Sequence, residues 1–292
     1  MAHRNPMPAV RAEPEPAAAR ERRILACAAR LPSPPEIVLA LVGAIDNDGK
    51  GAEQIAALAE RDQALTVRLL KISNSSYYGL TGQVGTVRDA VVILGFSSVR
   101  NLVIATEIAN CYGGLPAQRV GLADFWRHGL LSALCAAELA RRCGAEEGHA
   151  FTGGMLHDIG QLVLASAYPE EFRALLAAPP GAVDALALER ECFGMDHAAL
   201  GGWIAERWHF PGAICAALRG HHQPHPSDPL ACLLRSADRI AQALDAPASG
   251  GAALQACADA LVALGTRHTA PELLADIERR AGAAAELFES EI

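Results

Sequence analysis

Histidine and aspartate residues recur through this sequence in an order that could bind metal ions. The set is His128, His157, Asp158, His197, His221, His222 and Asp238. Imidazole and carboxylate groups are ligands for divalent cations such as Fe, Mn, Zn or Mg. Seven such groups suffice for two ions, so the pattern predicts a shared metal pocket. Asp124 lies one helical turn before His128, and we expect it to support that ligand.

The adjacent pair His157 and Asp158 is the centre of this set, with apolar residues on both sides. A buried carboxylate beside an imidazole is costly unless both are paired or bind a metal. The small residues Gly153, Gly154 and Gly160 would let other backbone segments approach this pair closely. A metal site is therefore the more specific interpretation of this pair, and a hydrogen-bonded polar cluster without metal is the alternative.

Helices must position these residues, because the sequence predicts an all-α fold. Ala and Leu dominate, aromatic residues are only 5%, and no convincing alternating strand pattern occurs. Helical spacing of apolar residues predicts helices over 20–30, from 36 onward, and over 52–61, 64–74, 87–94, 97–109, 124–143, 148–165, 169–177, 183–193, 197–208, 211–219 and 230–244, with two more in the last forty residues.

Breaks in these patterns predict the domain organisation. Residues 1–19 are rich in Pro, Ala and Glu without a period, which predicts a disordered tail. The break at Gly113–Pro116 divides the main domain, 20–245, into an N-terminal helical part over 20–115 and a second part over 116–245. The loop Ala246–Gly251 then begins a C-terminal helical extension over 246–292.

Composition limits the cellular setting. The chain has 292 residues, 51% of them hydrophobic, which is ample for a buried core. It contains no apolar run of membrane-spanning length and no secretory leader, so we expect no membrane partner. The net charge of −8 argues against nucleic acid as a partner. The eight cysteines form no CxxC pair, which predicts buried free thiols in a cytoplasmic protein.

Several motifs resemble one known family. The order His128, His157–Asp158 and Asp238 resembles the HD superfamily of helical metal-dependent phosphohydrolases. The sequence segments around these residues are similar to the HDOD domain, the HD-related output domain of bacterial signalling proteins. The motifs are Leu31–Pro35, Asp62–Leu70, Asn74–Gly79 and Ala90–Gly95 in the N-terminal half, and Phe193–Ala198, Trp208–Pro211 and His221–Pro224 in the HD-like half.

The resemblance implies a regulatory module that acts on signalling protein partners, since HDOD domains are generally non-catalytic relatives of the HD enzymes. The ligand order nevertheless matches that of HD-GYP cyclic di-GMP phosphodiesterases. In that scheme Asp158 would bridge two ions beside His157, and these two would be catalytic if the protein is an enzyme. One ion would also bind His128 and Asp238, and the other His197, His221 and His222.

The Asn74–Gly79 segment is predicted to end a helix in a tight turn, with a partner-docking surface as the alternative.

Two departures weaken the enzymatic alternative, a metal-dependent phosphohydrolase acting on a cyclic dinucleotide or nucleotide. The residues after His222 are Gln223-Pro224-His225-Pro226, so the Gly-Tyr-Pro motif is absent at this position. The position usually held by lysine is Gln161, which is neutral and cannot offset phosphate charge. Four other residues are candidates to offset phosphate charge: Arg127, Arg141, Arg219 and Arg239.

Overall fold

The computed structural model of the chain describes residues 16–43, 66–67, 70, 84–112, 121–177, 185–223, 227–246 and 250–288. In these ranges the only regular secondary structure is the α-helix, which confirms the all-α prediction. The predicted helices over 52–61 and 64–74 lie outside the described residues, except for Thr66, Val67 and Leu70, which are helical, and the Asn74–Gly79 segment lies outside them too. No described helix combines the length and the apolar character that a bilayer span requires.

The described helices of the N-terminal half are α1 (Ala17–Ala28), α2 (Glu36–Gly43), α5 (Val87–Leu94) and α6 (Phe96–Tyr112). Helix α1 begins earlier than the predicted start near Arg20. The carbonyl of Pro16 accepts the first bonds from the N–H groups of Ala19 and Arg20, and the alanines that follow Pro16 favour the helix. Residues 1–15, most of the predicted tail, lie outside the described ranges.

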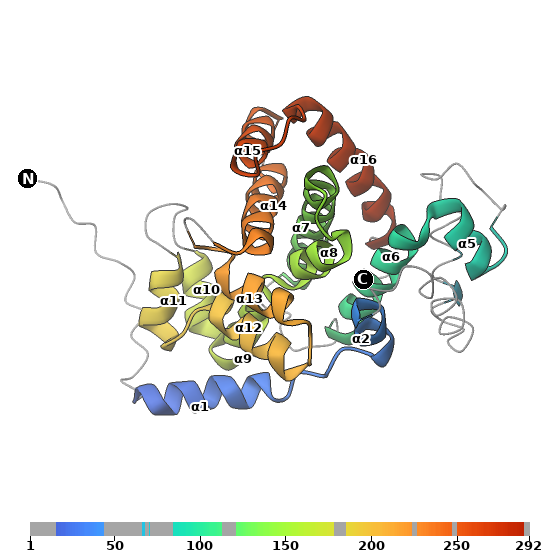
Figure 1. Cartoon of the computed structure of the whole chain (residues 1–292). Helices are drawn as coiled ribbons and strands as arrows, with labels where there is room; N and C mark the ends of the chain where they lie inside the picture. Colours follow the sequence, from blue (N-terminus) through green and yellow to red (C-terminus); the bar gives the residue numbers. More distant parts are fainter. Residues whose placement is uncertain are drawn as a thin grey trace, which may run out of the picture.

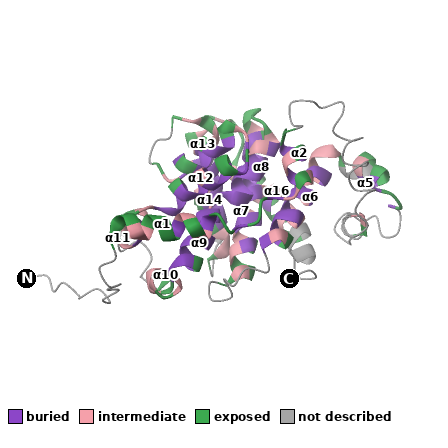
Figure 2. Ribbon diagram, turned by 90° about the horizontal axis from the view of Figure 1, so that it is seen from below, coloured by how far each residue is buried: buried purple, intermediate pink, exposed green. Residues whose placement is uncertain are grey.

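The second half of the chain continues through helices that match the predicted segments closely, except over 148–165, where two helices replace one. They are α7 (Leu122–Cys143), α8 (Glu147–Leu156), α9 (Ile159–Ala167), α10 (Pro169–Leu176), α11 (Ala185–Phe193), α12 (His197–Arg207), α13 (Gly212–Gly220), α14 (Pro229–Asp245), α15 (Gly250–Ala263) and α16 (Ala270–Phe288). Helices α7, α8 and α14 pack together at the centre of the molecule (Figure 1), and buried residues concentrate along them (Figure 2).

An aromatic stack joins the two halves. The ring of Tyr112, at the end of α6, stacks on Trp126 of α7 at 6.1 Å and on Trp208 after α12 at 5.5 Å between centroids. Its hydroxyl donates a hydrogen bond of 2.9 Å to the carbonyl of Pro32. Large buried aromatic rings contribute strongly to packing. This stack therefore fixes the N-terminal helices against the part of the chain that carries the His/Asp set.

The predicted helix over 148–165 is divided in two, and His157 and Asp158 lie at the junction between α8 and α9. Asp158 has φ −99° and ψ 8°, a bridge conformation that is frequent among active-site residues. Its carbonyl accepts the N–H of Gln161 at 2.8 Å as α9 begins. In a continuous helix the two side chains would point about 100° apart. The turn lets the side chains of His157 and Asp158 point toward the same position.

Two glycines bring neighbouring backbone against this junction, as the sequence predicted. A Cβ atom at Gly154 would lie 2.6 Å from the Cα of Ala133 in α7. A Cβ atom at Gly160 would overlap the backbone oxygen of His197 at the start of α12. Any larger residue at these positions would therefore push α7 or α12 away from the junction.

The C-terminal helices belong to the packed core. Helix α15 packs against α14, and α16 packs against α7. Leu273 and Ile277 of α16 are fully buried. The buried carboxylate of Glu138 in α7 accepts a bond from Arg142 at 3.0 Å and lies 3.3 Å from Arg280 of α16. A buried carboxylate without such partners would be costly, so these ion pairs favour the docked position of α16.

The cysteines are all free thiols, as predicted. Cys135, Cys215 and Cys257 are buried, whereas Cys143 is exposed at the end of α7. The prediction of burial therefore holds for only part of the set, because a helix terminus at the surface exposes its last residues.

Replacement of Gly160 by alanine is expected to destabilise the fold by about 1–3 kcal/mol, because the new methyl group must displace the backbone of His197. The measurement is the free energy of unfolding from denaturant titration. The matched control is Gly282→Ala in α16, where nothing lies within 4 Å. That change should instead stabilise the helix by about 0.5–1 kcal/mol. Equal effects of the two substitutions would contradict the packing at Gly160.

Candidate metal centre

The structure brings the seven predicted ligands together. Asp158, His197, His221 and His222 form one group, and His128, His157 and Asp158 form a second; in each group the ligand atoms lie within 4.8 Å of one another. Asp238 joins the second group, with Oδ1 3.2 Å from Nε2 of His128 and 3.6 Å from Nε2 of His157. Asp158 is common to both groups, as expected for a residue that bridges two ions.

Five separate elements supply these side chains. The group lies where α7, the α8–α9 junction, the start of α12, the end of α13 and the middle of α14 meet. Asp196 caps the N-terminus of α12 by accepting the N–H of Ala199 at 2.8 Å, which places His197 as the first helical residue. His221 directly follows α13 and caps its C-terminal end. The cluster is therefore assembled mainly from helix termini.

Two of the rings are anchored by backbone carbonyls. Nδ1 of His157 lies 2.8 Å from the oxygen of Gly154, and Nδ1 of His221 lies 2.7 Å from the oxygen of Leu218. A carbonyl oxygen can only accept, so in each ring Nδ1 carries the proton and a neutral ring presents the Nε2 lone pair. Both Nε2 atoms are buried and make no hydrogen bond of good geometry among the described residues, although Nε2 of His157 lies 3.3 Å from Oδ2 of Asp158, which raises the pKa of that ring. A bound cation would satisfy these two lone pairs, so the residues fit a metal ion.

Two other rings are anchored by carboxylates that the sequence analysis missed. Nδ1 of His128 lies 2.9 Å from Oδ2 of Asp245, and Nδ1 of His197 lies 2.8 Å from both oxygens of Glu189. Asp245 follows Asp238 by seven residues, two turns of α14, so helical spacing could have indicated it. Glu189 lies across a loop from its histidine, and no helical spacing predicts that contact.

The Nε2 edges of the His128 and His197 rings face the centre of the cluster. Nε2 of His197 lies 3.1 Å from Oδ1 of Asp158 and 2.9 Å from Nε2 of His222. Two imidazole nitrogens at that separation need either a proton between them or a shared cation. The anchored histidines thus direct their Nε2 atoms inward, which is the usual arrangement of histidine ligands in proteins.

The carboxylates strongly perturb the histidine pKa values. Burial alone would lower the pKa of His128, but Asp238 and Asp245 raise it to about 9. Burial would likewise lower that of His197, but Asp158 and Glu189 raise its pKa to about 10. The pKa of His221 is lowered by burial and by the neighbouring histidines. Without a metal, protons on some of the rings balance the carboxylate charge, and a cation would replace those protons.

Asp124 does not join the cluster. Its side chain is 82% exposed, and its carboxylate lies 3.5 Å from Arg127. The position beside His128 is occupied instead by Asp245, whose Oδ2 lies 2.9 Å from Nδ1 of the ring. One helical turn places Asp124 on the same side of α7 as His128 but nearer the helix end, where solvent surrounds it.

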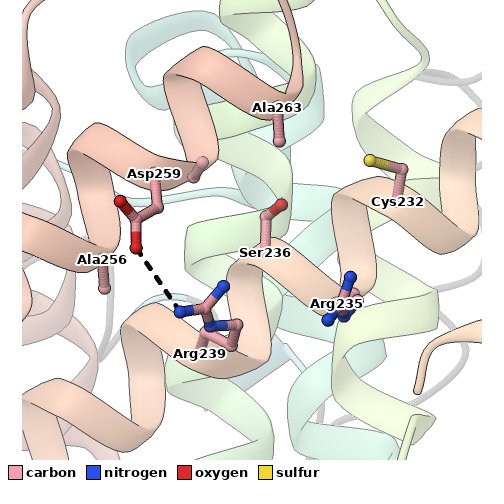
Figure 3. Close-up of a pocket in the computed structure, with 8 residues that line it drawn as sticks. Cys232, Arg235, Ser236, Arg239, Ala256, Asp259 and Ala263 are labelled. Atoms are coloured by element: carbon pink, nitrogen blue, oxygen red, sulfur yellow. Dashed lines mark hydrogen bonds and ion pairs between the residues drawn. The ribbon is translucent and has the colours of Figure 1, made fainter. Parts of the chain in front are cut away.

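Each of the four candidate phosphate-binding arginines is in an ion pair. Arg141 is held by Glu138, and the partners of the others are Asp245 for Arg127 (2.6 Å), Glu206 for Arg219 (2.5 Å) and Asp259 for Arg239 (3.4 Å). Arg239 lies in a small pocket of about 50 Å³ between α14 and α15, and none of the seven predicted ligands lines that pocket (Figure 3). These four arginines are therefore engaged with carboxylates.

The fold and the site define an all-helical protein with a buried His/Asp cluster of metal-ligand type. A family model of the HDOD domain matches residues 31–224, and the chain belongs to the HDOD family. The resemblance seen in the sequence is confirmed. The match ends before α14, so Asp238 and Asp245 lie beyond the matched residues.

Solved structures share this fold over nearly the whole chain. A protein named "Putative phosphohydrolase" from Shewanella amazonensis SB2B superposes with a TM-score of 0.70 at 27% identity, covering 91% of this chain and 97% of that one. An HDOD domain protein of unknown function from Geobacter sulfurreducens gives a TM-score of 0.67 at 21% identity, covering 92% and 97%. The second likeness shows the fold alone.

A relative of unassigned function is also similar in sequence. An uncharacterized protein of Treponema pallidum (strain Nichols) is 28% identical over 204 residues. The match covers 67% of this chain but only 38% of the relative's length.

Metal binding is expected to release protons, and the affinity should rise by at least about tenfold per pH unit at each site between pH 7 and about 9, because the pKa of His157 is raised as well. The reason is that His128 and His197 are protonated in this range without metal, and an ion must displace those protons. The measurement is calorimetric titration with Zn²⁺ over this pH range in buffers of different ionisation enthalpy. His268→Gln, a change at an exposed histidine outside the cluster, should leave the profile unchanged. An affinity that stops rising above pH 7 would contradict the raised pKa values.

Proposed function

We propose that this protein is a bacterial signal-transduction module of the HDOD type that holds divalent metal in the His/Asp cluster and acts on a signalling protein partner. The observation that carries the metal site is the anchoring of four rings through Nδ1, with the Nε2 atoms of His157, His197 and His221 facing Asp158 and that of His128 facing Asp238. Membership of the HDOD family supports the regulatory role.

The ligand set narrows the choice of metal. Five imidazoles and two carboxylates favour borderline ions such as Fe or Zn over the harder Mn and Mg, which prefer oxygen ligands. Asp158 with His197, His221 and His222 would hold one ion, and His128, His157, Asp158 and Asp238 would hold the other. We place the module in the cytoplasm, because its free thiols suit a reducing compartment.

Regulation is favoured over catalysis by the surroundings of the cluster. Gln161, in the first turn of α9, is neutral, and the candidate arginines are engaged by carboxylates. A phosphodiester carries negative charge that must be offset as it reacts. The acidic balance of the chain, −8, adds to this difficulty and also argues against a nucleic-acid partner.

The second candidate is a metal-dependent phosphohydrolase acting on a cyclic dinucleotide or nucleotide. It is favoured by the shared carboxylate of Asp158 and by the 27% identity with the Shewanella protein named as a phosphohydrolase. A pair of bound ions would activate water and stabilise a leaving oxygen. The task of this chain would be to orient His157 and Asp158 and to hold the ligand rings rigid.

Protein purified without chelators is expected to contain up to about two metal ions per chain, measured by elemental mass spectrometry. Asp158→Ala should deplete both ions, because its carboxylate belongs to both ligand groups, whereas His222→Ala should deplete only one. Asp124→Ala is the matched control and should retain the full content, because that side chain is exposed. Wild-type protein that binds no metal under any condition would overturn the proposed site.

The metal-loaded protein is expected to leave cyclic dinucleotides and nucleotides intact, because Gln161 is neutral and the four candidate arginines are paired with carboxylates. The measurement is chromatography of the reaction products after prolonged incubation. Turnover by the wild type that is abolished in Asp158→Ala, and retained in Asp124→Ala, would reject the purely regulatory role in favour of the second candidate.

A further inference from the structure

We propose that Glu189 is the positioning residue for one half of the metal centre, holding His197 so that its Nε2 faces the ion shared with His221 and His222. This inference rests on the proposed metal function. It assigns a role to a carboxylate on α11 that belongs to neither ligand group.

The contact is close and enclosed. Both oxygens of Glu189 lie 2.8 Å from Nδ1 of His197, and Oε2 also accepts the backbone N–H of His197 at 2.7 Å. Each of the two side chains is only 4% exposed. The carboxylate therefore restrains the backbone and the ring of the same residue, which leaves the ring little freedom to rotate.

The helix that carries Glu189 is itself fixed on both sides. Arg190 pairs with Asp196 at 2.6 Å, so successive residues of α11 hold successive residues at the start of α12. On the other side Arg20 of α1 donates to the carbonyl oxygens of Glu191 at 3.2 Å and Cys192 at 2.9 Å. The position of the carboxylate is thus set by the packing of α1, α11 and α12, and does not depend on a flexible surface loop.

A carboxylate does more to a ligand ring than a carbonyl does. Backbone carbonyls suffice to orient His157 and His221. The negative charge of Glu189 additionally makes the ring of His197 a stronger donor to a cation and balances part of the cation's charge. Partners of this kind typically change metal affinity by about 10–100-fold when removed. The second ligand group has its own carboxylate anchor, because Asp245 holds His128. The two ligand groups of the metal centre can therefore be tested separately.

The test is a titration of metal-free, full-length protein with Co²⁺, followed by its visible absorption spectrum, which reports the ligand geometry of each bound ion. Glu189→Gln retains the size of the side chain and removes its charge. The matched control is Glu191→Gln, which makes the same charge change at an exposed position on the same helix. We expect Glu189→Gln to bind one ion normally and the other about 10–100-fold more weakly with an altered spectrum, and Glu191→Gln to match the wild type.

The retained ion at the His128 group serves as the internal check that the variant is folded. Unchanged binding of both ions by Glu189→Gln would overturn the role of Glu189 and leave the metal site intact. Equal weakening of both ions would also overturn it, because Glu189 would then be supporting the fold as a whole. A wild type that binds no Co²⁺ would overturn both the proposed function and this inference.

Discussion

The structure depends on keeping a dense group of ionisable side chains buried and correctly oriented. Asp158 is surrounded by imidazoles whose ring centroids lie 4.0 to 5.5 Å apart. Burial of a carboxylate without partners is costly, and so is burial of several imidazoles whose lone pairs face one another. The protein meets this constraint with an anchor on the outer nitrogen of four rings, which leaves the inner nitrogens facing the carboxylates of Asp158 and Asp238.

Meeting that constraint determines how the helices pack. Five of the seven ligands come from helix ends, where a side chain can reach the centre without passing through a helix face, and only His128 and Asp238 lie inside helices. The division between α8 and α9 puts His157 and Asp158 on a turn, and Gly160 lets the start of α12 approach that turn. The same junction sets the position of His197, so one close contact serves both the packing of two helices and the geometry of the cluster.

Charges around the cluster serve the fold. The four candidate arginines pair with carboxylates, and Arg127 in particular pairs with Asp245, the anchor of His128. A metal in such a site would tie α7, α12, α13 and α14 together, which suits a module whose response depends on how its helices pack.

The sequence by itself determined the all-helical fold, most helix boundaries and seven residues that converge, because apolar spacing and residue type are local properties. Among the predicted ligands and their support it erred on Asp124, since spacing along one helix does not reveal which side chain another helix presents. Only the tertiary structure decided that Asp245 and Glu189 anchor the rings and that the candidate arginines are paired. It also replaced one predicted helix over 148–165 with two. These features arise from contacts between segments distant in the chain, where packing against another helix overrides local preference.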